Sequence, residues 1–181
     1  VQRQNGQKML GLQSWIALPQ ACEEIAPSFQ HYGADSLPTV KDTGFTARVI
    51  AGSSFGVKSP VDMVSPWFYT EVALQAGTTA PLDPDHEERA IYLIDGEIEI
   101  AHERYQGPRL LIFRPGDRIA VKANTPARMM FLGGDALEGP RHIWWNFVSS
   151  SKERIEQAKQ DWKSGRFTQV PDEHEFIPLP E

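Results

Sequence analysis

Short apolar segments separated by turn residues recur along the central part of the chain. In residues 68–75 apolar and polar side chains alternate, with Phe68, Val72 and Leu74 on one side of the predicted strand. Similar segments recur at intervals of roughly ten residues, at 9–18, 45–51, 90–94, 97–101, 110–113, 119–121, 128–132 and 143–148. Many short strands at regular spacing predict an all-β sandwich or barrel.

Turn residues lie between these segments. Asp95-Gly96 separates two of them and predicts a two-residue hairpin, because glycine adopts positive φ without steric cost. Residues 114–117 (Arg-Pro-Gly-Asp) and 52–54 (Gly-Ser-Ser) predict further turns. Residues 20–42 contain prolines and a glycine, which is typical of a connector, with one helical turn predicted at 21–25.

One helix is predicted near the end of the chain. Ser150 and Glu153 have the spacing of a capping box. Three apolar residues then fall on one helical face, namely Ile155, Ala158 and Trp162. Gly165 suits the left-handed position after a helix. The opposite face is charged, which predicts exposure to solvent, and residues 167–180 are predicted to be extended chain packed against the body.

The composition is that of an acidic globular domain. The chain has 181 residues, enough for one ordinary domain with additional chain. Its formal charge of -6 excludes a globally basic nucleic-acid binder and offers no attraction to anionic lipid. Cys22 is the single cysteine, so an intrachain disulfide is excluded.

We expect a cytoplasmic protein, with the nucleus as the alternative in a eukaryote. Because the first residue is Val1, we also expect a fragment or a processed product.

Three regions of the sequence resemble known families. Residues 90–100, followed by 113–117, resemble a cupin barrel, in which a strand ending in Gly-Glu precedes a Pro-Gly-Asp turn. Residues 142–155, with the segments up to Pro180, resemble the C-terminal region of pirins, which have two cupin domains. Residues 11–19 resemble the last strand of the pirin N-terminal domain.

The resemblance implies a fold class and a domain organisation. The fold is all-β, a cupin (double-stranded β-helix or jelly-roll barrel) with one C-terminal α-helix. Residues 1–42 would contain the last strand of a preceding cupin domain and a linker. Residues 43–148 would form the C-terminal cupin barrel, and residues 149–181 the helix and the extended tail.

The resemblance also implies that the family's metal, usually iron held by three His and one Glu, lies in the N-terminal domain. The fingerprint of that site, a Pro-His-Arg-Gly-Phe-type stretch, does not occur in this sequence. In the cupin pattern counted back from Gly96, the Glu position falls on Arg89. The two alternate His positions fall on Asp83 and Asp85, or, with a longer spacer, on Leu82 and Pro84.

The third His position of the pattern, after Thr125-Pro126, falls on Ala127. A cation at the Glu position would repel a metal ion. We therefore expect no metal, no bound cofactor and no identifiable catalytic residue in this chain.

The five histidines, His31, His86, His102, His142 and His174, have neither alternate nor helical ligand spacing. His86 has acidic neighbours, at Asp83, Asp85, Glu87 and Glu88, that could attract a hard cation. An exposed acidic loop is the interpretation that we favour. Other chemical motifs, such as a phosphate loop or a nucleophile elbow, do not occur.

Two packing questions stay open. Trp144 and Trp145 are neighbours on a predicted strand, so one ring is expected inside the barrel and the other outside. The outer ring is a candidate for an inter-domain or subunit contact, or else packs under the tail. The barrel interior is either open to a small apolar ligand or filled by side chains such as Ile91, Leu93, Ile112 and Met130.

The preferred hypothesis is a metal-free C-terminal cupin domain that acts as the structural or interaction half of a pirin-like bicupin. One alternative is part of an iron-dependent, quercetin 2,3-dioxygenase-like enzyme whose metal site lies in an N-terminal domain. Another is a redox-linked transcription co-regulator. The expected partner is an N-terminal cupin domain or another protein, with a homo-oligomer left open. Neither direct nucleic-acid contact nor membrane binding is expected.

Overall fold

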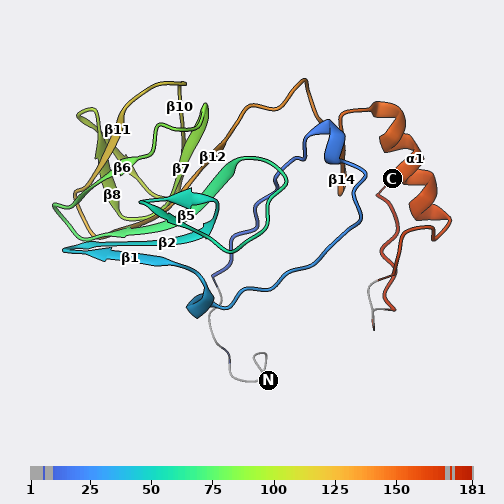
Figure 1. Cartoon of the computed structure of the whole chain (residues 1–181), viewed down its shortest axis with the longest axis horizontal. Coiled ribbons are helices and arrows are strands. Elements are labelled where there is room, and N and C mark those ends of the chain that lie inside the picture. Colours follow the sequence, from blue (N-terminus) through green and yellow to red (C-terminus); the bar gives the residue numbers. More distant parts are fainter. Residues whose placement is uncertain (1–5, 7–9, 170–171, 173, 181) are drawn as a thin grey trace. The chain divides into compact units, whose positions relative to one another are not determined.

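The computed structural model describes residue 6, residues 10–169, residue 172 and residues 174–180. The chain forms two compact units (Figure 1). The larger unit is Glu24–Glu138, and the smaller one combines Val1–Glu23 with Gly139–Glu181. The domain limits predicted from the resemblance, at 42/43 and 148/149, stay a prediction.

The larger unit contains two antiparallel sheets. The first has six strands in the order β1-β2-β5-β12-β7-β10, namely Thr39–Asp42, Phe45–Ala51, Trp67–Leu74, Ala127–Gly134, Glu88–Asp95 and Arg109–Phe113. The second has four strands in the order β6-β11-β8-β9, namely Thr79–Leu82, Ile119–Ala123, Glu97–Ile100 and Glu103–Gln106. A small hairpin joins β3, Ser53–Ser54, to β4, Val57–Lys58, and a 3₁₀ turn, η3, spans Ala34–Ser36. The all-β prediction is confirmed.

The core of this unit lies between the inner faces of the two sheets. In β5 every second residue is buried, Phe68, Thr70, Val72 and Leu74, which confirms the predicted alternation. Each fully buried Val, Leu, Ile or Phe side chain contributes about 1.5–3 kcal/mol. The core also includes Ile91 and Leu93 of β7, Ile98 of β8, Val121 of β11, and Met129 and Phe131 of β12.

Gly96 connects the two sheets rather than closing a hairpin. β7 pairs with β10 and β12 in the six-stranded sheet, whereas β8 belongs to the four-stranded sheet. The predicted Asp95-Gly96 hairpin is therefore wrong. The glycine is still required, because its φ is +86° and a Cβ there would lie 2.4 Å from the carbonyl oxygen of Pro126. The sequence signal identified the backbone conformation but not the partner of each strand.

Two of the predicted interior residues lie on the outer face. Ile112 of β10 pairs with Ala90 and is 77% exposed, whereas its neighbours Leu111 and Phe113 pair with inward-facing residues. Met130 is buried but pairs with Tyr92, on the opposite face from the core residue Met129. Side chains alternate along a strand, so an error of one position reverses the face. Ile91 and Leu93 are confirmed as interior residues.

Two other segments differ from the predictions. Residues 10–18 form no strand with any other described residue, and Met9 lies outside the described residues. A strand requires a paired neighbouring strand, and no strand among the described residues pairs with this segment. The predicted turn at 52–54 is displaced, because Ser53 and Ser54 pair with β4 and the chain reverses at residues 55–56.

The smaller unit contains the helix α1, Lys152–Lys163, and the hairpin of β13, His142–Trp144, and β14, Phe147–Ser149. Its 3₁₀ turn, η2, spans Gln20–Cys22 and so begins one residue before the helical turn predicted at 21–25. The helix cap is Ser151 rather than the predicted Ser150, since the Ser151 hydroxyl accepts the Arg154 backbone N–H at 3.2 Å.

Within the described residues no helix combines the length and apolar character that a bilayer crossing requires.

Aromatic rings hold the helix, the hairpin and the tail of the smaller unit together. Trp162 packs edge-on against Trp145 at 5.1 Å between ring centroids and stacks on Phe176 at 5.8 Å. Its indole N–H donates to the carbonyl of Ile177 at 2.8 Å. The described part of the tail therefore packs as predicted, while residues 170, 171 and 173 lie outside the described residues.

The predicted opposite orientations of Trp144 and Trp145 are wrong. The run 143–148 is a hairpin rather than one strand, and Trp145 occupies its turn with φ of +49°. Alternation does not extend through a turn, so both rings contact the ring of Phe147, at 6.2 and 5.5 Å. Both tryptophans belong to the smaller unit.

A buried ion pair fixes the start of the smaller unit's helical segment. The Glu23 carboxylate contacts the Arg141 guanidinium at 2.9 Å, and these side chains are 12% and 8% exposed. Glu23 also accepts the backbone N–H of Ser150 at 2.9 Å and the hydroxyls of Ser149 and Ser150 at 3.0 Å. Arg141 donates in addition to the carbonyl of Leu18 at 2.9 Å. Both charges are therefore buried with their hydrogen bonds made.

These contacts shift the pKa of Glu23. Burial acts to raise its pKa, but the hydrogen bonds from Ser150 and Ser149, together with the positive charge of Arg141, lower it below the ordinary value of 4.5. A carboxyl group with a lowered folded-state pKa stabilises the fold above the unfolded pKa. That stabilisation is lost as pH falls through the folded-state value.

We predict that alanine at Gly96 destabilises the larger unit far more than alanine at Gly116. Both glycines have positive φ, +86° and +79°, so both variants carry a backbone penalty of about 1 kcal/mol. Only at Gly96 does the new Cβ meet backbone, so Gly96→Ala should cost about 3 kcal/mol in total. Urea denaturation of both variants measures the difference, and equal losses would contradict the close contact at Gly96.

We predict that Glu23→Gln lowers the free energy of unfolding by about 2–3 kcal/mol at pH 7, because it leaves the buried Arg141 charge without its counter-ion. The difference from the unmodified chain should begin to shrink as pH falls below about 4.5, where the unfolded chain becomes protonated, and it should be lost as pH falls through the lower pKa of the native carboxyl. Denaturant titrations at pH 7 and in acid measure both effects. Glu156→Gln, which removes a 67% exposed carboxylate, is the control and should change stability little.

Candidate functional site

Arg89 is the largest fully buried side chain of the larger unit and lies inside the barrel. It occupies the inner face of β7 in phase with Ile91 and Leu93, and it is 1% exposed. Its neighbours across the sheet are Phe113 of β10 and Gly133 of β12. The strand alternation that buries two apolar residues thus places a guanidinium in the core.

The hydrogen bonds of Arg89 are incomplete within the protein. Its Nη2 donates to the carbonyl oxygen of Arg114 at 3.2 Å. Its Nε and Nη1 are buried and have no acceptor among the described residues. Because arginine stays protonated at all physiological pH values, the site carries a permanent positive charge with two unused donors. Burying such a charge is unfavourable unless it is paired.

The residues at the expected ligand positions do not fit a metal ion. Arg89 occupies the position of the acidic ligand, and its positive charge repels a cation. At the two other positions on the same segment, the Asp83 carboxylate accepts the backbone N–H of Asp85 at 3.0 Å, as in an Asx turn. With the longer spacer, one position is Leu82, which is buried in the core. Across the described residues, no three His, Cys, Asp or Glu side chains gather as a metal site would require.

Ala127 lies far from Arg89, which corrects the motif comparison. It begins β12 and pairs with Leu74, whereas Gly133, near the other end of β12, pairs with Arg89. Six residues of strand separate these positions, a span of about 20 Å. The spacing in the sequence therefore did not identify positions that converge in this barrel.

His86 does not organise the acidic loop around itself. Its Nδ1 lies 3.1 Å from the carboxylate of Asp135, and its ring stacks on Phe68 with 5.3 Å between centroids. Asp135 was not among the residues singled out from the sequence, because it is far along the chain from His86. The pair holds the loop before β7 against the end of β12, and we assign it a structural role.

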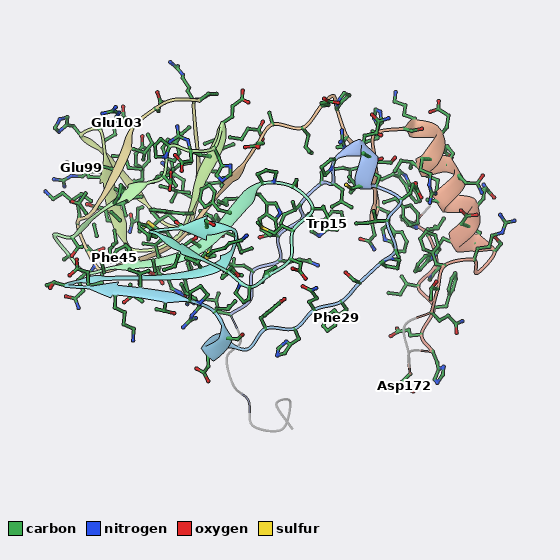
Figure 2. The ribbon with its side chains drawn as sticks, in the orientation of Figure 1. Trp15, Phe29, Phe45, Glu99, Glu103 and Asp172 are labelled. Carbon is green, nitrogen blue, oxygen red and sulfur yellow. The ribbon has the colours of Figure 1, made fainter. Side chains whose placement is uncertain are left out.

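Acidic side chains on the four-stranded sheet are also engaged in local contacts. The Glu97 carboxylate accepts from the Asn124 amide at 3.0 Å, and Glu99 lies opposite Arg104 in the register of β8 and β9. Figure 2 labels Glu99 and Glu103 at this edge of the barrel. No arrangement there places two carboxyl groups around a substrate cavity.

A hollow of about 300 Å³ in the smaller unit is a second candidate site. It is lined by Trp15, Ile16, Ala17, Leu18, Glu23, Asn146 and Val148. Its acidic group, Glu23, is held by Arg141 and two serines, so its oxygens are already occupied. The lining is otherwise mostly apolar and provides no nucleophile or base for a reaction.

The sequence pattern placed Arg89 at the position of the acidic ligand in the cupin motif, but it did not predict that the side chain is buried. The phase of Arg89 with Ile91 and Leu93 was the available signal for burial, since residues two apart on a strand share a face. The Glu23–Arg141 pair was missed, because 118 residues separate its members (141 − 23). Its only local signal was the run of serines at 149–151, which suits a carboxylate acceptor.

Comparisons with known proteins identify the family. Residues 69–168 match the pirin C-terminal cupin domain. A pirin-like protein of Caulobacter vibrioides is 48% identical over 182 residues, which cover 99% of this chain and 62% of that protein. A Pseudomonas aeruginosa protein named as a candidate quercetin 2,3-dioxygenase is 32% identical, over 84% of this chain and 49% of its own length. The solved structure of a quercetin 2,3-dioxygenase from Acinetobacter baumannii superposes with a TM-score of 0.79 at 26% identity, covering 92% of this chain and 57% of that one.

The chain therefore spans about half to three fifths of the length of these relatives. The cupin fold with a C-terminal helix, predicted from the hairpin and turn motifs, is confirmed. The match covers the strands from β5 to β14 and the whole of α1. This chain belongs to the pirin family of cupin proteins.

Proposed function

We propose that this chain is the metal-free cupin half of a two-domain pirin and that it acts by binding a second cupin domain. The observation that carries the proposal is the buried guanidinium of Arg89, at the position where the cupin pattern has an acidic metal ligand. A permanent cation inside the barrel opposes the binding of a second cation there. The barrel then serves as a rigid scaffold and not as a metal centre.

Residues 10–18 support the interaction part of the proposal. Leu10, Leu12 and Ile16 occupy alternate positions that would share one face of an extended strand, and they are 65%, 43% and 46% exposed. Trp15, labelled in Figure 2, is 53% exposed on the other side. Apolar residues in strand phase, without a partner strand among the described residues, suit addition to the edge of another sheet. The partner that fits is the N-terminal cupin domain, whose last strand this segment resembles.

The alternative is that the chain is part of an iron-dependent enzyme of the quercetin 2,3-dioxygenase type. Two of the relatives bear that name, one of them as a candidate. In this alternative the iron lies in the N-terminal domain, outside the residues of this chain. The contribution of this chain would be to hold that domain in its folded form, and its own residues would contact neither iron nor flavonol.

We predict that the 181-residue chain neither retains iron nor consumes quercetin. After anaerobic incubation with Fe(II) and gel filtration, elemental analysis should find far less than one iron per chain, because Arg89 repels the cation. Quercetin absorbance in air should fall no faster than in buffer. The Acinetobacter quercetin 2,3-dioxygenase is the positive control. One iron per chain with metal-dependent loss of quercetin would contradict the proposal.

We predict that Leu12→Asp weakens binding to the separately produced N-terminal cupin domain of the parent protein by about 10-fold or more, because it places a charge in an apolar contact. Gln13→Asp adds the same charge one residue further on, on the opposite side of the segment, and should bind nearly as tightly as the unmodified chain. Isothermal titration calorimetry measures both affinities. Equal losses for the two variants would argue against strand addition, and no binding by the unmodified chain would refute the partner.

A further inference from the structure

The barrel of the larger unit contains a charge that the protein itself does not balance. Arg89 is 1% exposed, and only one hydrogen bond from its guanidinium to a protein acceptor is observed, to the carbonyl of Arg114. Nε and Nη1 are buried without an acceptor among the described residues. Deprotonation is not available to arginine as a way to remove the charge.

The side chains that flank Arg89 on the inner face cannot supply a negative charge. In the register of the sheet these are Phe113 on β10 and Gly133 on β12, and Ile91 follows on β7 itself. Phe68, opposite Gly133 on β5, is also apolar. The neighbours of Arg89 on the inner face of the sheet are therefore apolar, and in apolar surroundings a buried cation holds an anion strongly.

Two acidic residues of the loops beside β7 and β12 already have partners. Asp135 contacts Nδ1 of His86 at 3.1 Å, and Asp83 accepts the backbone N–H of Asp85 at 3.0 Å. To neutralise Arg89 one of these carboxylates would have to give up its contact and enter the core. A counter-ion from solution requires no such rearrangement of the loop.

The packing around Arg89 limits the size of such an ion. A Cβ at Gly133 would lie 2.3 Å from the carbonyl oxygen of Glu88 and 2.7 Å from the ring of Phe68. The backbone beside Arg89 is thus tightly packed, and because the residue is 1% exposed, a bulky anion has no open access to its guanidinium. Small ions of one to three heavy atoms, such as chloride or formate, are the class that suits so deeply buried a cation.

We propose that Arg89 binds a small monovalent anion, of the size of chloride or formate, inside the barrel. The Nε–H and Nη1–H groups are the donors, and Arg114 positions the guanidinium through its carbonyl oxygen. Charge-assisted hydrogen bonds of this kind are stronger than those between neutral groups. The position that holds a carboxylate ligand in the cupin metal pattern thus becomes an anion site by reversal of its charge. This proposal does not depend on the binding of a second cupin domain.

The test is the thermal stability of the full chain when chloride or formate replaces gluconate at constant ionic strength. Gluconate is the bulky reference anion. Small anions should raise the melting temperature of the unmodified chain by about 2–4 °C, because a ligand that binds only the folded state stabilises it. Arg89→Met should fold, since an apolar side chain suits this environment, and its melting temperature should not respond to the exchange. Arg104→Met removes a cation whose side chain is 71% exposed, and it should respond like the unmodified chain.

Two results would overturn the proposal. One is an equal response of Arg89→Met and the unmodified chain, which would assign the effect to general salt action. The other is the absence of any response in the unmodified chain. If Arg89→Met does not fold, the chlorine NMR line width of chloride with the unmodified chain decides the question. Broadening that formate reverses and gluconate does not reverse supports the site, and broadening that is insensitive to formate refutes it.

Discussion

The six-stranded sheet depends on the register of β12 between β5 and β7. β12 pairs with both strands along most of its length, so its register determines which residues of three strands face the core. A shift by one residue would turn the apolar set of each strand towards solvent. Gly133 shows how closely this register is specified, because no side chain fits between Glu88 and Phe68 at that position. The same register that brings Ile91 inside also brings Arg89 inside.

Two buried arginines show how differently one fold can treat a buried charge. Arg141 in the smaller unit meets the carboxylate of Glu23 and the carbonyl of Leu18, so its charge and several of its donors are satisfied within the chain. Arg89 in the larger unit is at least as buried, but among the described residues its guanidinium bonds only to a backbone carbonyl. A buried ion pair with its hydrogen bonds made holds together segments that are distant in the sequence. An unpaired buried charge is unfavourable unless a counter-ion from solution balances it. This contrast is why we assign Glu23 and Arg141 to stability and Arg89 to binding.

Family membership establishes the fold of this chain, whereas the chemistry of its barrel has to be judged from the residues that line it. The match to the pirin C-terminal cupin domain establishes ancestry and fold. It does not assign a metal to this barrel, because Arg89 has the wrong charge for a ligand and Ala127 lies far from it along β12. The strand-like, exposed segment at 10–18 is consistent with the proposed division of labour between two cupin domains.

Local patterns in the sequence determined the all-β class, the position of most strands, the helix and the family, since these depend on alternation, turn residues and short motifs. The positive φ of Gly96 was likewise readable, because glycine is required wherever that conformation meets close backbone. Tertiary structure alone decided which strands pair, and so it turned a predicted hairpin into a crossing between sheets and placed Ile112 on the outer face. It also brought Glu23 to Arg141 and left Arg89 without a carboxylate. Contacts between residues far apart in the sequence depend on the packing of the whole chain. A local sequence pattern therefore does not indicate which distant charged residue will lie next to a given side chain.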